Sequence, residues 1–285
     1  MNHRFSLPLF VFLISFLQIN AQELTFVSDT VSENDQLGFD VAMAENFAVS
    51  SAWQKGVWYK GELKEEAGCV YLHKKVKDDW VYQERITCPE PRKDDCFGRA
   101  VAITDDYLVV GAASRNQVTS VGHWAREGAV YIYENTEDGY SFQHELKSDK
   151  LEADVRFGEE VALGGGYLAV VCKYPQDGIN SKKYVGAVLV YKLSENAEPK
   201  KIATLVSQNG TGLFGYSITI HNNLLVVGEN DQRIRVYELK DESVDLMHEM
   251  FPQAPIYTIV YDEKFADEFF RDNLGRPDRP RIRAS

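Results

Sequence analysis

The stretch FGRAVAITDDYLVVGAAS, residues 97–114, decides the fold because the chain repeats it. FGEEVALGGGYLAVV begins at Phe157, and FGYSITIHNNLLVVG begins at Phe214. A weaker copy begins at Leu37, so the glycines at 38, 98, 158 and 215 are spaced 60, 60 and 57 residues apart. A fixed period of this length is typical of stacked units, each of which needs its neighbours to bury its apolar faces.

Each copy predicts four short strands. In the second unit RAVAIT, the turn Asp105-Asp106 and YLVVGAA predict a hairpin, because Asp, Asn and Gly tolerate turn conformations and the flanking runs are β-branched and aromatic. The other units place Glu45-Asn46, Gly165-Gly166 and Asn222-Asn223 at the same turn. A third run (AGCVYLHKK, EGAVYIYEN, VGAVLVYKL, RIRVYELK) and a fourth (VYQERITCP, SFQHELKSD, KIATLVSQ, LMHEMFPQ) complete each unit.

The predicted fold is therefore all-β, a β-propeller of four-stranded antiparallel blades. No strand–helix alternation is present, which excludes a parallel α/β sheet. Four blades are recognisable, and a fifth is either incomplete or completed by the N-terminal segment LTFVSDTVSENDQLGFD, which resembles a fourth strand and linker. We expect the propeller to cover residues 22–261 and a short helix with a basic tail to cover 262–285. An incomplete ring would leave an open edge for self-association.

At these motifs the chain resembles the FG-GAP repeat of integrin-α head propellers and secreted bacterial proteins. The resemblance covers about residues 23–253 and recurs four times. It implies a propeller fold, whereas function does not follow from the fold alone. Integrin-type repeats often carry an Asp-rich calcium loop between the first two strands, and here Asp105-Asp106 forms only a tight turn. The chain therefore resembles the calcium-free form, and we expect no cofactor and no metal site.

The first 21 residues have the pattern of a secretory signal peptide. His3 and Arg4 precede the apolar run Leu7–Leu17, and Ala21 is the expected cleavage position. The alternative, a membrane anchor, is disfavoured because a spanning helix needs about 20 apolar residues. No other stretch is long enough for a transmembrane segment. We expect a secreted, periplasmic or cell-surface protein.

The net charge of the chain limits the classes of partner that we expect. The chain has 31 basic and 43 acidic residues and a net charge of −12. Nucleic acids and anionic membranes select basic surfaces, so neither is expected as a partner.

The four cysteines stand at 69, 88, 96 and 172. Because export exposes a chain to oxidising conditions, Cys88 and Cys96, which bracket the turn-rich PEPRKDD, are the candidate disulfide. Cys69 and Cys172 are left unassigned.

Catalytic signatures are missing. The chain has no HExxH, no GxSxG and no GxxxxGK[ST] motif, so we assign no catalytic residue. Its paired carboxylates, such as Asp94-Asp95 and Glu159-Glu160, are typical of a solvated acidic surface.

The units differ most between their second and third runs, where WQKGVWYKGELKEE, SRNQVTSVGHWARE and KYPQDGINSKKY all lead to one rim. Aromatic residues and arginine in loops on a rigid fold are typical of binding surfaces, although these aromatics could also cover their own loops. The candidate binding residues are Trp53, Trp58, Tyr59, His123, Trp124, Arg126, Tyr174 and Tyr184.

These features favour a binding module for an extracellular protein or a glycan over an enzyme. The alternatives are a polysaccharide-processing enzyme with an acidic site on the same rim, and a structural surface protein. A glycan binder should expose coplanar aromatic rings. An enzyme should show a cleft with at least two buried carboxylates of shifted pKa.

Overall fold

The computed structural model describes residues 32, 34–118, 124–137, 139–148, 155–175, 184–207, 213–230 and 233–250, with backbone only for 116–118, 124–126, 174, 175 and 184. All regular structure in these ranges is β-strand, and none of it is helix. Accordingly, no helix in this part of the chain could cross a membrane. The predicted signal peptide, the N-terminal and C-terminal parts of a fifth blade, and the C-terminal helix and tail lie outside these ranges.

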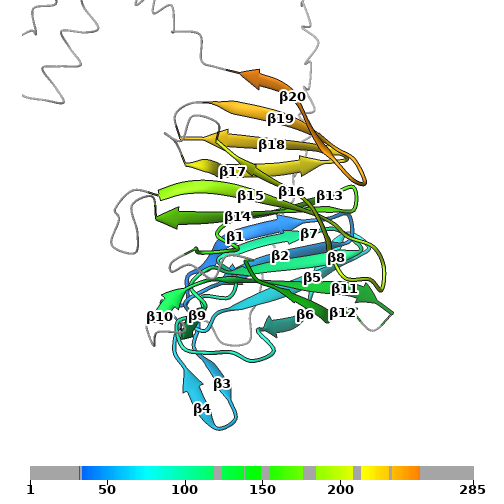
Figure 1. The fold of residues 1–285 in the computed structure, drawn as a ribbon. Coiled ribbons are helices and arrows are strands. Elements are labelled where there is room, and N and C mark those ends of the chain that lie inside the picture. The colour runs from blue at the N-terminus through cyan, green and yellow to red at the C-terminus, as the bar shows by residue number, and fades with distance from the viewer. Residues whose placement is uncertain are drawn as a thin grey trace, which may run out of the picture.

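Four antiparallel four-stranded sheets form the body of the molecule, and we call them blades 1 to 4 (Figure 1). Blade 1 contains β1 (Leu37–Met43), β2 (Phe47–Ala52), β5 (Cys69–Val76) and β6 (Asp79–Thr87). Blade 2 contains β7 (Ala100–Ile103), β8 (Tyr107–Ala112), β11 (Ala129–Thr136) and β12 (Gly139–Leu146). Blade 3 contains β13 (Val161–Gly164), β14 (Tyr167–Pro175), β15 (Tyr184–Lys192) and β16 (Lys200–Val206). Blade 4 contains β17 (Phe214–His221), β18 (Leu224–Glu229), β19 (Ile234–Leu239) and β20 (Val244–Met250).

Two short ribbons interrupt the first two blades between their second and third strands. They are β3 (Val57–Tyr59) with β4 (Glu62–Lys64), and β9 (Asn116–Val118) with β10 (Trp124–Arg126). The sequence places long connections here but does not indicate that they pair with themselves. In Figure 1 the β9–β10 ribbon lies at the left of the molecule and the β3–β4 ribbon projects below it.

The blades pack as a four-bladed β-propeller, as the repeats predict. The first strands lie innermost, because β1 contacts β7, β7 contacts β13 and β13 contacts β17. The four predicted hairpin turns join the first two strands of each blade. The turns of blades 1 and 2 contact each other. The Asp105 carboxylate accepts hydrogen bonds from the backbone amide and the side chain of Asn46 in the neighbouring turn, at 3.1 and 2.9 Å.

The apolar cores lie between consecutive blades. One cluster joins blades 1 and 2, a second joins blades 2 and 3, and a third joins blades 3 and 4. Phe97, Phe157 and Phe214 are each at most 1% exposed within these clusters. Since successive side chains of a strand point to opposite faces, a blade with neighbours on both sides must be apolar at every position. This requirement explains the continuous apolar runs of the repeat.

In units 1 to 3, a glycine at or just before the start of the third strand is a second shared feature of the repeat. A Cβ added to Gly68, Gly128 or Gly186 would lie 2.1, 2.2 or 1.7 Å from the carbonyl oxygen of the phenylalanine that opens the next blade. No side chain fits at that distance, so the backbones of adjacent blades meet only because these residues are glycines.

The predicted Cys88–Cys96 disulfide is wrong for this structure, in which all four cysteines are buried and Cys88 and Cys96 are not joined. Arg115 lies against Cys88 and donates from Nη1 to the Cys88 sulfur at 3.3 Å. The same nitrogen pairs with the Asp95 carboxylate at 2.7 Å, and both side chains are nearly fully buried. A buried ion pair therefore ties this loop to blade 2 in the place where the spacing suggests a covalent bond.

Candidate binding site

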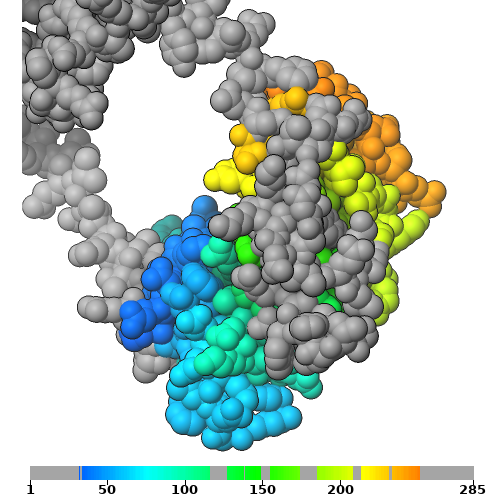
Figure 2. Space-filling model, turned by 60° about the vertical axis from the view of Figure 1, so that its left-hand side comes forward, coloured from blue at the N-terminus to red at the C-terminus, as the bar shows by residue number. Residues whose placement is uncertain are grey.

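The β3–β4 ribbon carries the most exposed of the predicted binding residues whose side chains are described. The Trp58 side chain is 73% exposed and lies opposite Leu63, which is 43% exposed. Tyr59 is half-buried, and the Lys60 ammonium lies 4.9 Å from the centre of its ring. Figure 2 shows this ribbon at the bottom of the molecule, standing out from the body of blade 1. Trp58 therefore does not fold back to cover its own loop.

Trp53 has a different environment. It is half-buried, and its ring packs edge-on against Phe39 with centroids 5.5 Å apart and planes inclined by 61°. The Arg99 guanidinium lies over both rings, 5.3 Å from Trp53 and 4.7 Å from Phe39. Trp53 thus belongs to a packed cluster at the start of the inner strands, and the two rings do not form a flat platform.

The remaining predicted residues are placed only by their backbone or lie outside the described residues. Trp124 and Arg126 are on β10, with Trp124 paired to Val118 of β9. Tyr174 and Tyr184 stand at the adjoining ends of β14 and β15. His123 falls outside the described ranges. For these four residues of the predicted rim, Trp124, Arg126, Tyr174 and Tyr184, the structure therefore gives only the backbone position.

The inner strands bring charged residues together near the axis. The residues that follow the four glycines of the repeat are Phe39, Arg99, Glu159 and Tyr216. Glu159 accepts from Lys173 at 2.9 Å and lies 3.6 Å from Arg99. Burial alone would raise the pKa of Glu159, but the hydrogen bond and charge of Lys173, together with the charge of Arg99, lower it below its usual value. Near the axis, the Glu159 carboxylate is therefore already paired with Lys173 and Arg99 of the same chain.

A hollow of about 300 Å³ lies deeper along the axis and is lined by strands of all four blades. Residues 41–42, 101–103, 161–163 and 218–220 line it, and the surface that they present to it is mostly polar. Its two carboxyl groups are Asp40 and Glu160. The Asp40 carboxylate accepts from the Val101 amide at 2.7 Å. Burial raises the pKa of Asp40 despite this bond. Burial and the nearby Asp40 charge raise the pKa of Glu160.

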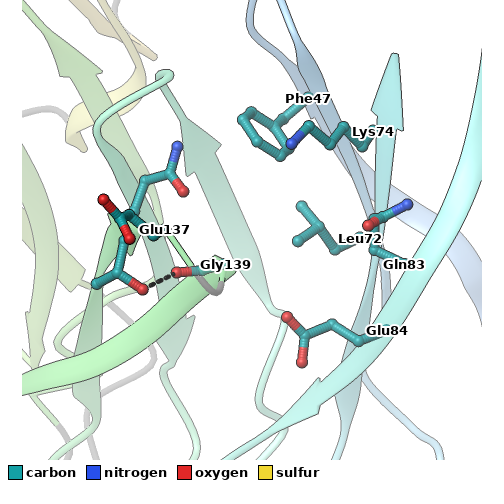
Figure 3. A pocket seen from close by; sticks show the side chains of 9 residues that line it. Phe47, Leu72, Lys74, Gln83, Glu84, Glu137 and Gly139 are labelled. Atoms are coloured by element: carbon teal, nitrogen blue, oxygen red, sulfur yellow. Dashed lines mark hydrogen bonds between the residues drawn. The ribbon is translucent and has the colours of Figure 1, made fainter. Parts of the chain in front are cut away.

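A second hollow, of about 350 Å³, lies between blades 1 and 2 near the hairpin turns (Figure 3). Phe47 and Leu72 form its apolar floor, while Lys74 and Glu84 approach from blade 1. Burial raises the pKa of Glu84. Asn135, Thr136, Glu137 and Gly139 complete it from blade 2. No sequence signal indicates this groove, because its two walls come from separate units and share no motif.

Neither hollow brings together a cluster of candidate metal ligands among the described residues. No group of three or more His, Cys, Asp or Glu side chains that could hold an ion occurs within the described residues. Chemically, the axial hollow offers two carboxyl groups in a mostly polar lining. The groove between blades 1 and 2 offers charges of both signs, and the β3–β4 ribbon offers an exposed aromatic surface.

Comparison with known protein families agrees with this architecture. Residues 80–133 match the family model of the FG-GAP repeat. This segment is similar to an FG-GAP repeat, and the chain folds as a four-bladed β-propeller. The matched segment runs from β6 of blade 1 through the first three strands of blade 2, so the sequence repeat and the structural blade are offset by one strand.

No curated protein is significantly similar to this chain in sequence. Among solved structures, a "putative 6-phosphogluconolactonase" from Bacteroides uniformis matches 72% of the chain at 12% identity and a TM-score of 0.45, over 52% of its own length. Sqt1 from Chaetomium thermophilum matches 72% of the chain at 15% identity and a TM-score of 0.41, over 44% of its own length. The chain thus spans about half the length of these structures.

Proposed function

We propose that this propeller is an exported binding module that recognises an extracellular protein through the rim bearing the β3–β4 ribbon. The observation that carries the proposal is the exposed pair Trp58 and Leu63 on a paired ribbon beside a rigid blade. Tryptophan is enriched among the residues that dominate binding energy, and loops on rigid folds commonly carry such residues. The apolar stretch before Ala21 supports export.

A protein partner is favoured over a glycan by the geometry of the aromatic residues. Sugar rings stack on exposed flat rings, whereas Trp53 and Phe39 are inclined by 61° and lie under Arg99. Trp58 stands with an aliphatic neighbour, Leu63, in the pairing register of its ribbon. An apolar pair bordered by Glu62, Lys60 and Lys64 has the composition of a small protein contact, an apolar centre with a polar rim.

The test is a pull-down from the extracellular fraction of the source cells with the mature chain, beside a glycan array. Replacing Trp58 and Leu63 together (Trp58→Ala, Leu63→Ser) should abolish capture of a specific protein band. Trp80→Ala, a tryptophan on β6 of the same blade, is the matched control and should retain that band. Equal capture by the ribbon variant, or binding only to glycans, would contradict the proposal.

An enzyme is the second candidate, and the axial hollow is the observation that favours it. Asp40 and Glu160 are two carboxyl groups with raised pKa in one cavity, the arrangement expected of a general acid and base. Polysaccharide substrates can be screened for release of reducing ends. An activity that disappears in Glu160→Gln, in a variant that keeps the wild-type melting temperature, would favour this candidate over the binding module.

A further inference from the structure

Blade 4 exposes one face that is buried in the other blades. Leu225 and Val227 of β18 point into the core shared with blade 3, so Leu224 and Val226 point away from it. Leu224 is 41% exposed, and Ile234, on the same face of β19, is 42% exposed. The positions that correspond to Val226 in blades 1 to 3 are Val49, Val109 and Ala169, all at most 2% exposed. Blade 4 therefore has the surface of an interior blade without a following blade on it.

Blade 1 exposes the complementary half of the same interface. On β1 the side chains of Val41 and Met43 are 65% and 71% exposed. The corresponding Val101 and Ile103 of β7 are 5% and 7% exposed, because they pack into the cluster shared with the preceding blade. Within the described residues, none of the apolar clusters joins blade 4 to blade 1.

We propose that these two faces bind each other between two copies of the chain. In this arrangement the exposed face of blade 4 in one copy packs against Val41 and Met43 of β1 in the next copy. Within one chain, β7 packs against blade 1 and β17 packs against blade 3 in the same way. The occupant is a second copy because the chain itself carries both halves of an interface that it already forms three times. Such an interface is heterologous and can close into a ring or extend.

The glycines of the two faces support this pairing. Between blades 2 and 3 a Cβ on Gly111 would lie 2.2 Å from the Gly158 carbonyl oxygen, so two backbones meet there. Gly228 occupies the place of Gly111 in the strand LLVVGE, and Gly38 occupies the place of Gly158. A Cβ on Gly38 would meet nothing within 4 Å, and one on Gly228 would meet only Ser217. The same contact can therefore form between Gly228 of one copy and Gly38 of the next.

Two sequence differences beside these faces predict that the interface between copies is weaker than the interfaces between blades within one chain. Aligning the third strands on the residues that bond back to the first turn, Lys75, Asn135, Leu193 and Leu239, places Gln232 where units 1 to 3 have Gly68, Gly128 and Gly186. Leu37 also replaces the phenylalanine of the later units. Association should consequently depend on protein concentration, with the apolar rows supplying most of the contact.

The test is sedimentation velocity of the mature chain over a concentration series. The sedimentation coefficient of the wild type should rise with concentration. Val41→Asp and Val226→Asp each place a carboxylate in the interface and should weaken association by about tenfold or more. Val76→Asp is the matched control, since Val76 ends β5 and is 46% exposed, and it should associate like the wild type.

Mixing the two variants identifies the head-to-tail arrangement. The Val41→Asp chain keeps its blade 4 face and the Val226→Asp chain keeps its β1 row, so an equimolar mixture should regain one interface and form dimers. Loss of association in both single variants without recovery in the mixture would contradict the head-to-tail pairing. Circular dichroism melts establish that both variants are folded.

Comparing the mature chain with a shortened one tests whether residues 251–285 cover the exposed face of blade 4 in the same molecule. A wild-type chain that stays monomeric at every soluble concentration overturns the proposal. If the chain truncated after Met250 then associates, residues 251–285 are the occupant of the blade 4 face and not a second copy. Pull-down through the Trp58 ribbon is unaffected by either result, so this inference and the proposed function fail independently.

Discussion

Blades 2 and 4 contain nearly the same second strand in two environments. YLVVGA of β8 is buried at every position after Tyr107, whereas LLVVGE of β18 alternates between buried and more exposed residues. The local sequence, hairpin turn and pairing of the two strands correspond. The difference is that blade 2 has neighbours on both faces and blade 4 has one on a single face. An apolar strand of this type thus indicates the faces that it can bury, and its neighbours determine which of them it does bury.

The largest expected effect is the loss of an interior anchor. Phe157→Ala removes a side chain with no exposure from the interface of blades 2 and 3, and should lower the free energy of unfolding by about 3–5 kcal/mol. Tyr216→Ala, on the inner strand of blade 4 with a side chain 60% exposed, should cost less than about 1 kcal/mol. Urea unfolding of both variants measures the difference, and equal losses would show that blade 4 is as well packed as blade 2.

A comparable loss is expected from the buried ion pair beside Cys88. Arg115→Ala leaves the Asp95 carboxylate unpaired at a fully buried position and should cost about 3–5 kcal/mol. The matched change is at Lys93, whose pair with Glu65 is solvent-exposed, and Lys93→Ala should leave the melting temperature nearly unchanged. A small effect of Arg115→Ala would show that the PEPRKDD loop does not depend on this pair.

The same substitution at equivalent positions of β8 and β18 measures the difference between the two strands directly. Val109→Ala in β8 removes two methyl groups from a closed interface and should cost about 2 kcal/mol. Val226→Ala in β18 removes the same atoms from a half-buried face and should cost less than about 1 kcal/mol. Both are measured by urea unfolding in dilute solution, where copies do not associate. Similar costs would mean that something covers the blade 4 face.

The smallest effect is the pH dependence contributed by the axis. Because the pKa of Glu160 is raised in the folded protein, the folded state binds more protons than the unfolded state above the ordinary glutamate value of 4.5. Stability from this group is therefore greatest at low pH and is lost as pH rises through that value toward the folded pKa. In Glu160→Gln this decline should disappear from the difference in unfolding free energy. Blade 4 has Ser217 at the corresponding position and contributes no such dependence.

Much of the architecture follows from the sequence because each blade is local. The paired turns at Asp105-Asp106 and Asn222-Asn223 and the apolar runs around them are contiguous, so a single unit suffices to predict its hairpins. The repeat then supplies the stacking, as each unit needs a neighbour to bury its second face.

The features that depend on contacts between units are harder to predict. Cys88 and Cys96 are close in sequence, but the fold brings Arg115, which follows β8, against Cys88 and Asp95 of this loop. Trp53 and Trp58 belong to one predicted loop, yet Trp53 packs against Phe39 and Arg99 near the axis. Asp40 and Glu160 share a cavity although two whole units separate them in the chain. The rim side chains of His123, Trp124, Arg126, Tyr174 and Tyr184 stay a prediction.

The central claim, that β8 and β18 are one strand in two environments, is tested most directly by thiol labelling of Val109→Cys and Val226→Cys in dilute native protein. The four native cysteines are buried, so their reaction in the wild type gives the background. We expect the thiol at 226 to react within the time of mixing and the thiol at 109 to react only as the protein unfolds. Equal protection of both thiols in the monomer would contradict this claim.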